Sequence, residues 1–370
     1  MNFSRSNEMK KNAGRNTAID GLRTIAILLM IASHTSRLVD WSERREWSRW
    51  VLLIEPLTAS LFLMLVGASL VFSWQAFSYQ ALFEKQNEST EIENASSRKR
   101  ARGKWYQKQA LRALILWVIS CVFYTVEEGF HLPDALLLSG ILATISYTII
   151  LGMILVSVRF SIPILFFACS LLFGYHLYLD HSNTLLFMIT VGNSPLMPLF
   201  LFACLGALLA KIILLNNRYF NWIVIVTACL VLAWIFHRHP FEAVFTKPLG
   251  RYEMTRTLIS GNHDIKIEKT IPYYNLRPIL IPTIASIIIL LYAVLTLIKY
   301  LLSKCSKYIF VIGKRSLEVY ILHLSLLALL VLHGGMRPLH QAWQGDLTLV
   351  LAIGTCYLWS ITREKFKRHS

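Results

Sequence analysis

Long apolar runs, separated by short polar segments, dominate this chain. A bilayer core requires about 20 mostly apolar residues per helix, and many of the runs approach that length. We therefore predict an all-α, polytopic transmembrane helix bundle of about ten helices. The predicted spans are residues 18–38, 51–74, 109–126, 135–156, 160–179, 195–215, 219–236, 277–301, 316–333 and 346–362. Three of these are short or interrupted, so nine or eleven spans are alternatives.

Lysine and arginine are unevenly distributed over the connecting segments. Segments 1–17 and 75–108 carry four and seven of them, whereas two short loops on the opposite side carry none. Such an excess marks the cytoplasmic side, and an even number of spans returns the C-terminus there. We expect a cytoplasmic segment at 1–17, one transmembrane domain at 18–362 and a cytoplasmic tail at 363–370. Within the domain we expect a cytoplasmic loop at 75–108, flexible over 84–104 with a basic end near anionic lipid, and an outer loop at 237–276.

Composition narrows the class of protein further. The chain has 370 residues, of which 55% are hydrophobic and only 16% charged, with a net charge of +16. A soluble nucleic-acid-binding protein can be this basic, but it is not also this apolar. Soluble enzymes, disulfide scaffolds and disordered chains are likewise excluded, and no nucleic-acid partner is expected. The six cysteines lack the spacing of a zinc site, so we expect no metal.

Ionisable residues inside a span are costly and are therefore candidates for function. The first span carries Asp20, Arg23 and His34. Arg23 and His34 are 11 residues apart, which places them on one helix face about 16 Å apart along the axis. One face thus presents a cation near the cytoplasm and an imidazole beyond the bilayer midplane.

This pair of residues suits acyl transfer. Burial favours the neutral imidazole, and a neutral imidazole can accept a proton from a hydroxyl or amine that attacks an acyl carbon. A cation three turns deeper could hold the acyl donor. The alternatives are that Arg23 extends to the headgroups, that Asp20 pairs with Arg23 or caps the helix, and that His34 bonds a neighbouring helix.

The ninth predicted span carries a second polar stripe. Ser316, Tyr320 and His323 fall at i, i+4 and i+7, so they line one face of an otherwise apolar helix. The stripe could bind a ligand or join two helices. Two further ionisable candidates are Glu55, near the outer end of the second span, and Arg112, at the start of the third. Gly206 and Ala210 allow close helix packing, which a homodimer could use.

The motifs resemble those of the transmembrane acyltransferase superfamily, which includes acyltransferase family 3 and the heparan-α-glucosaminide N-acetyltransferase-like proteins. The likeness runs over residues 18–335 in the family order. Its motifs are Ile19-Asp20-Gly21-Leu22-Arg23 through His34, the Phe-rich segment from Leu61 to Gly67, Ser139-Gly140 to Ile145, Ser194-Pro195 to Lys211, and Ser316 through Tyr320 to His323.

The resemblance implies an acyl-CoA donor bound from the cytoplasmic side and an acceptor hydroxyl or amine, often on a sugar, on the outer side. It implies that His34 is the catalytic base or a transient acyl carrier and that Arg23 contacts the donor. We assign Asp20 and Arg112 to donor binding as well. Glu55, Ser316, Tyr320 and His323 are assigned to substrate binding or support.

We therefore expect a multi-pass protein of the plasma or inner membrane that transfers an acetyl or other short acyl group. Its partners would be acyl-CoA such as acetyl-CoA, a glycan or small-molecule acceptor, and membrane lipids. The first alternative is a multi-spanning transporter or exporter of a small molecule, although no inverted repeat is found. The second is a membrane scaffold or sensor in which the polar groups only join helices.

Overall fold

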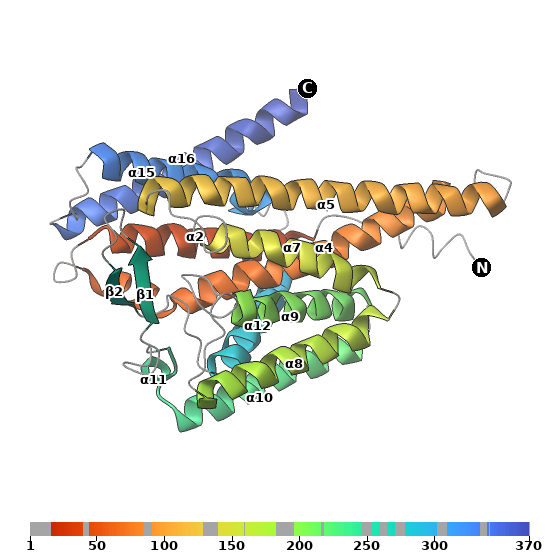
Figure 1. Ribbon diagram of the computed structural model, residues 1–370, viewed down its shortest axis with the longest axis horizontal. Coiled ribbons are helices and arrows are strands. Elements are labelled where there is room, and N and C mark those ends of the chain that lie inside the picture. The colour runs from red at the N-terminus through yellow and green to blue at the C-terminus, as the bar shows by residue number, and fades with distance from the viewer. Residues whose placement is uncertain are drawn as a thin grey trace. The chain divides into compact units, whose positions relative to one another are not determined.

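The computed structural model describes residues 16–39, 44–84, 91–128, 140–158, 160–182, 196–215, 218–245, 254–259, 265–270, 278–301, 309–333, 339 and 341–369. This part of the chain is almost entirely helical, with one small antiparallel hairpin (Figure 1). Its elements are α2 (Thr17–Arg37), α3 (Glu46–Leu53), α4 (Glu55–Glu84), α5 (Glu91–Glu128), α7 (Ile141–Ser157), α8 (Ser161–Ser182), α9 (Leu196–Leu214), α10 (Arg218–Arg238), α11 (Phe241–Phe245), β1 (Met254–Ile259), β2 (Ile265–Thr270), α12 (Leu280–Leu301), α14 (Val311–Lys314), α15 (Ser316–His333) and α16 (Ala342–His369).

Six of the described helices are long and apolar enough to cross a bilayer: α2, α4, α5, α10, α12 and α16. Four shorter apolar helices, α7, α8, α9 and α15, coincide with the remaining predicted spans. The chain is therefore an integral membrane protein, and the helical class predicted from the sequence is confirmed. That all ten helices cross, with both termini in the cytoplasm, stays a prediction, as do the domain boundaries.

One local expectation differs from the structure, and a second region gains detail. The polar stretch 84–104 was expected to be flexible, yet α5 begins at Glu91 and runs without a break into its apolar part. Charged residues of high helix propensity allow an apolar helix to continue beyond the bilayer. In the expected outer loop, β1 pairs with β2 in antiparallel register from Met254 opposite Thr270 to Ile259 opposite Ile265.

The helices pack into two compact units. The first comprises Met1–Phe62, Phe241–Phe245 and Ser286–Ser370, and the second comprises Leu63–Pro240 and Thr246–Ala285. In the first unit, α2 packs against α3, α14, α15 and α16. Its core joins Ile27 and Ile31 of α2 to side chains of α14, α15 and α16, namely Val311, Ile312, Val319, Ala352 and Cys356.

Glycine brings α14 directly onto the backbone of α2. A Cβ atom at Gly313 would overlap the carbonyl oxygen of Asp20, so a side chain cannot fit there. Gly313 N donates to Thr24 Oγ1 at 3.0 Å, and Thr24 Oγ1 in turn donates to the carbonyl oxygen of Asp20 at 2.9 Å. Helix α14 is thereby fixed against the start of α2.

The second unit is joined by similar close approaches. Gly67 of α4 lies against the backbone of Ala203 in α9, and Gly206 of α9 lies against the backbone of Met64 in α4. Between α5 and α7, Ser146 Oγ donates to the carbonyl oxygen of Ala113 at 2.7 Å. Small residues that allow backbones to approach are the usual means of packing helices in lipid. Gly206 thus packs against a helix of its own chain.

Candidate active site

His34 and His323 meet across the interface between α2 and α15. His34 Nδ1 lies 3.2 Å from His323 Nε2, and the two rings are inclined by only 19°. Their centroids are 5.3 Å apart, so the rings meet edge to edge through these nitrogens rather than face to face. His323 is fully buried, whereas His34 is half-buried. The sequence placed both residues on polar faces but did not predict their contact.

The hydrogen bonds around His323 determine which nitrogen of His34 carries a proton. His323 Nδ1 lies 3.2 Å from the carbonyl oxygen of Val319, which can only accept, so His323 Nδ1 must donate. In a neutral imidazole the other nitrogen is then an acceptor. His323 Nε2 therefore accepts a hydrogen bond from His34 Nδ1. This leaves Nε2 of a neutral His34 unprotonated and able to act as a base.

The polar stripe of α15 forms as predicted, because Ser316, Tyr320 and His323 all lie on this helix. The ring of Tyr320 packs edge-on against His323 with centroids 5.3 Å apart, and Phe62 packs edge-on against Tyr320 at 6.3 Å. Tyr320 is buried, whereas Ser316 at the helix start is half-buried. Tyr320 thus packs against the imidazole of His323 inside the protein.

A buried carboxylate flanks His34. Glu55, at the start of α4, is 5% exposed. Its Oε1 accepts a hydrogen bond from Ser33 Oγ at 3.0 Å and pairs with the Arg37 guanidinium. Ser33 precedes His34, and Arg37 lies one turn after it. Glu55 therefore fastens α4 to α2 at the level of His34, a supporting contact that the sequence did not specify.

Arg23 and Asp20 lie together at the other end of α2. Arg23 Nη1 forms an ion pair with Asp20 Oδ1 at 3.0 Å, in which Asp20 is buried and the Arg23 side chain is 23% exposed. This is the i, i+3 pairing that the sequence offered as one alternative. A role for either residue in donor binding stays a prediction. Arg112 lies on an exposed face of α5 in the second unit, and its assigned role also stays a prediction.

Two contacts show that α2 and the α14–α15 segment run parallel and in register. Thr24 and Gly313 are 289 residues apart, and so are His34 and His323. Ten residues, or about 15 Å of helix, separate the two contacts along α2, and ten residues also separate them along the α14–α15 segment. The Gly313 contact near Asp20 therefore aligns His323 with His34 more than two turns away.

Comparison with known proteins identifies the family. The profile of the acyltransferase domain, acyltransferase 3, matches residues 16–362 and so includes α2, α15 and every site residue described above. The chain belongs to acyltransferase family 3. Among curated proteins, none matches it significantly. The resemblance carried by Arg23, His34 and the stripe of α15 is thereby confirmed, and the chain contains a membrane acyltransferase domain.

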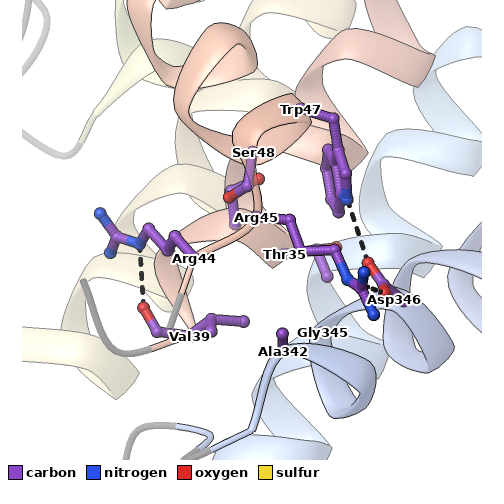
Figure 2. A pocket seen from close by; sticks show the side chains of 10 residues that line it. Thr35, Val39, Arg44, Arg45, Trp47, Ser48, Ala342, Gly345 and Asp346 are labelled. Atoms are coloured by element: carbon purple, nitrogen blue, oxygen red, sulfur yellow. Dashed lines mark hydrogen bonds and ion pairs between the residues drawn. The ribbon is translucent and has the colours of Figure 1, made fainter. Parts of the chain in front are cut away.

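A small pocket opens in this acyltransferase beside the last turn of α2 (Figure 2). Trp47 Nε1 donates to Asp346 Oδ1 at 3.1 Å, and Arg45 Nε pairs with Asp346 Oδ2 at 2.7 Å. Ser36 and Ser48 also line it, and their buried hydroxyls have no hydrogen-bond partner within the described residues. Ser36 lies about 160° around α2 from His34, so the pocket sits beside the end of the helix and not on the imidazole's face.

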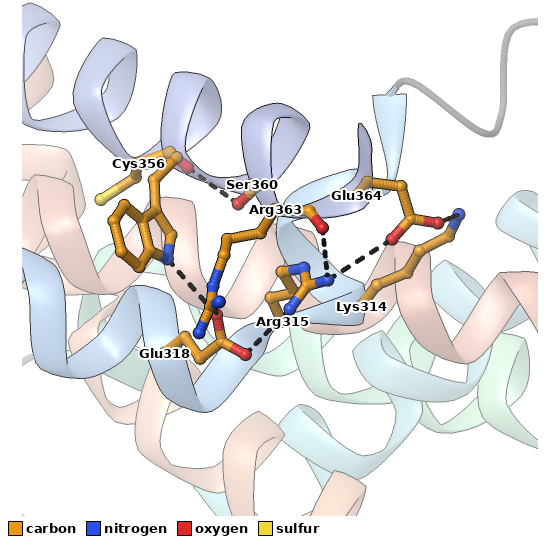
Figure 3. A network of polar contacts seen from close by, with 8 residues as sticks. Lys314, Arg315, Glu318, Cys356, Ser360, Arg363 and Glu364 are labelled. Atoms are coloured by element: carbon orange, nitrogen blue, oxygen red, sulfur yellow. Dashed lines mark hydrogen bonds and ion pairs between the residues drawn. The ribbon is translucent and has the colours of Figure 1, made fainter. Parts of the chain in front are cut away.

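The opposite end of the first unit of the acyltransferase carries a charged network (Figure 3). Arg315 Nη1 pairs with Glu318 Oε1 at 2.9 Å, and its Nη2 donates to the carbonyl oxygen of Arg363 at 3.1 Å. Glu364 lies 3.8 Å from Arg315 and 3.7 Å from Lys314. Sequence reasoning did not assign these residues. The i, i+3 spacing of Arg315 and Glu318 was a signal, but their α16 partners follow only from the fold.

The described part of the chain contains no cluster of candidate metal ligands. Within the described residues, no group of three or more His, Cys, Asp or Glu side chains is placed to hold an ion.

Proposed function

We propose that the protein transfers an acetyl or other short acyl group from cytoplasmic acyl-CoA to a hydroxyl or amine of a glycan or small molecule at the outer side. His34 is the catalytic base. The observation that carries this proposal is the hydrogen-bond relay from His34 through His323 to the carbonyl oxygen of Val319, which leaves His34 Nε2 unprotonated.

The protons and bonds of this transfer balance with the acceptor, His34 and acyl-CoA alone. As the acceptor oxygen or nitrogen attacks the acyl carbon, its proton passes to His34 Nε2, the new C–O or C–N bond forms and the C–S bond to CoA breaks. The CoA thiolate then takes up the proton, which restores the neutral imidazole. His323 is a positioning residue in this scheme, because its Nε2 still accepts from His34 Nδ1 after His34 is protonated.

The donor is proposed to enter at the Arg23 end of α2. Arg23 and His34 are separated by about 16 Å along the helix, a length comparable with an extended pantetheine arm. Lys314, Arg315 and Arg363 lie at the same end and exceed the two carboxylates of their network by one charge. An excess of cations favours a polyanionic donor.

The acceptor is proposed to enter at the opposite end. Arg45, Trp47 and Asp346 place hydrogen-bonding side chains in the pocket beside the last turn of α2. These side chains would contact a part of the acceptor that does not react, because Ser36 places the pocket about 160° around α2 from His34.

The test separates donor binding from transfer. The protein is reconstituted in liposomes with acetyl-CoA at the Arg23 side and an extract of native glycans and lipids at the other, and release of CoA thiol is followed. We expect His34→Gln to lower this release by about 10²-fold to 10⁴-fold while stabilisation by acetyl-CoA in a thermal shift is retained. Arg23→Ala should lose that stabilisation.

His239→Gln is the matched control, because His239 is exposed at the end of α10 and outside the pair. It should behave as the wild-type protein does in both assays. A folded His34→Gln variant with the wild-type rate would refute the role of His34, and a protein that acetyl-CoA does not stabilise would refute the donor.

A further inference from the structure

The last turn of α2 carries a cation beside the imidazole of His34. Arg37 follows His34 by three residues, so the two side chains leave the helix about 4.5 Å apart along its axis and about 60° apart around it. Both residues belong to the first unit, and the positive charge of Arg37 interacts electrostatically with His34. Arg37 is thus the arginine of α2 that lies nearest to the proposed base.

A buried carboxylate holds the guanidinium of Arg37. Glu55 Oε1 pairs with Arg37 Nη2 and also accepts a hydrogen bond from Ser33 Oγ at 3.0 Å. The Glu55 side chain is only 6% exposed, whereas that of Arg37 is 28% exposed. The bond from Ser33 already joins α4 to α2, so the second bond of the carboxylate serves to orient a guanidinium that keeps access to its surroundings.

His34 is held in the same manner. Its partner His323 is fully buried, while His34 itself is half-buried. Two neighbouring groups of α2 are therefore each fixed by a buried group from another helix, and each stays partly accessible. A contact that only joins helices needs no accessible member, as the buried bond between Gly313 and Thr24 illustrates.

The proposed transfer requires a cation at this place. As the acceptor attacks, the acyl carbonyl oxygen takes up the electron pair of its double bond and is an oxyanion until the C–S bond breaks. The proton on His34 Nδ1 is engaged by His323, and the proton on His323 Nδ1 is engaged by the carbonyl oxygen of Val319. A positioned cationic donor at the developing oxyanion lowers the barrier of such a reaction.

We propose that Arg37 is a second catalytic residue, whose guanidinium donates hydrogen bonds to the oxyanion formed from the acyl carbonyl. This rests on the proposed function, in which acyl-CoA is the donor and His34 the base. A guanidinium has five N–H groups in a planar fork, so it can bind the Glu55 carboxylate and an oxyanion at once. When the carbonyl re-forms, the negative charge passes to the CoA sulfur as the C–S bond breaks. Glu55 then positions Arg37 as His323 positions His34.

The test measures release of CoA thiol by the full-length protein in liposomes at increasing acetyl-CoA concentration, with the extract of native glycans and lipids on the other side. Arg37→Ala should lower kcat about 10²-fold to 10³-fold, as removal of an oxyanion donor does. The KM for acetyl-CoA should change by less than about twofold, because the contact is made only in the transition state. Arg49→Ala removes an exposed arginine of α3 in the same unit and should keep the wild-type kcat.

Chemical rescue separates catalysis from a structural role. Guanidinium chloride, far below the concentrations that unfold proteins, should raise the kcat of Arg37→Ala about 10-fold, because the free cation replaces the lost donor. Sodium chloride at the same concentration should not, and the wild type and Arg49→Ala should respond to neither salt. Arg37→Gln keeps a hydrogen-bond donor for Glu55 without the charge, and its kcat should fall at least about 10-fold.

A folded Arg37→Ala protein with the wild-type kcat would overturn the proposal, and so would a loss of kcat that guanidinium does not restore. A raised KM for acetyl-CoA at unchanged kcat would make Arg37 a donor contact and would overturn it as well. If Arg37→Ala does not fold, a wild-type kcat in Arg37→Gln has the same meaning. In each case a loss of rate in His34→Gln leaves the proposed function intact, whereas a wild-type protein that releases no CoA thiol would overturn the two together.

Discussion

Replacing Gly313 by alanine tests whether a backbone contact at one end of α2 aligns the histidine pair at the other. A Cβ atom at this position would fall more than 1 Å short of the 3.0 Å that real Cβ atoms keep from the Asp20 carbonyl oxygen. That oxygen belongs to the backbone of α2, so no side-chain rotation relieves the overlap. The α14 segment must move away from α2 by that amount.

The magnitude at the active site follows from the parallel register of the two helices. His34 Nδ1 and His323 Nε2 are 3.2 Å apart. A shift of 1 Å carried along α15 would lengthen this distance to more than about 4 Å, beyond the range of a hydrogen bond. We expect acyl transfer to fall about 10-fold to 100-fold, as for other 1 Å misplacements, and the free energy of unfolding to fall by about 1–3 kcal/mol.

The assay compares CoA thiol release and thermal unfolding of Gly313→Ala with those of Gly354→Ala. Gly354 lies in α16 of the same unit, and a Cβ atom there meets nothing within 4 Å. Alanine at Gly354 should therefore be neutral or stabilise the protein by up to about 1 kcal/mol. A Gly313→Ala protein with the wild-type rate and unfolding temperature would show that the contact does not align the pair.

Three further substitutions test the neighbouring contacts. His323→Ala should lower acyl transfer by about 10-fold to 100-fold without loss of acetyl-CoA binding, because His34 loses the partner that fixes its tautomer; an unchanged rate would contradict the relay. Glu55→Gln should lower the free energy of unfolding by about 1–3 kcal/mol, since Arg37 loses a charged partner, as measured by denaturant titration. Gly67→Ala should lower the free energy of unfolding of the second unit by at least about 1 kcal/mol, because its Cβ atom meets the backbone of Ala203. A variant of wild-type stability would show that α4 and α9 can move apart without cost.

The sequence predicted the features that depend on helix periodicity. Arg23 and His34 share a face of α2, and Ser316, Tyr320 and His323 share a face of α15, because residues at multiples of 3.6 recur on one side of any helix. The apolar runs likewise predicted where the described apolar helices lie, since run length is set by the thickness of the bilayer.

Contacts between distant segments could not be predicted in the same way. His34 and His323 are 289 residues apart, and neither periodicity nor composition says which helix faces which. Glu55 was assigned to support the site, but its bonds to Ser33 and Arg37 depend on how α4 leaves the end of α2. The helical start of α5 was missed for a different reason, because polarity indicates exposure to water and not the absence of a helix.

The contacts of the first unit also restrict how many helices cross the membrane. Helix α15 begins beside the start of α2, and α16 runs back from Asp346 near the end of α2 to Glu364 near Lys314. An odd number of crossings must therefore separate α2 from α15. An even total, such as the ten spans predicted from the sequence, keeps His323 beside His34, whereas nine or eleven would reverse α15. The number of helices that cross stays a prediction.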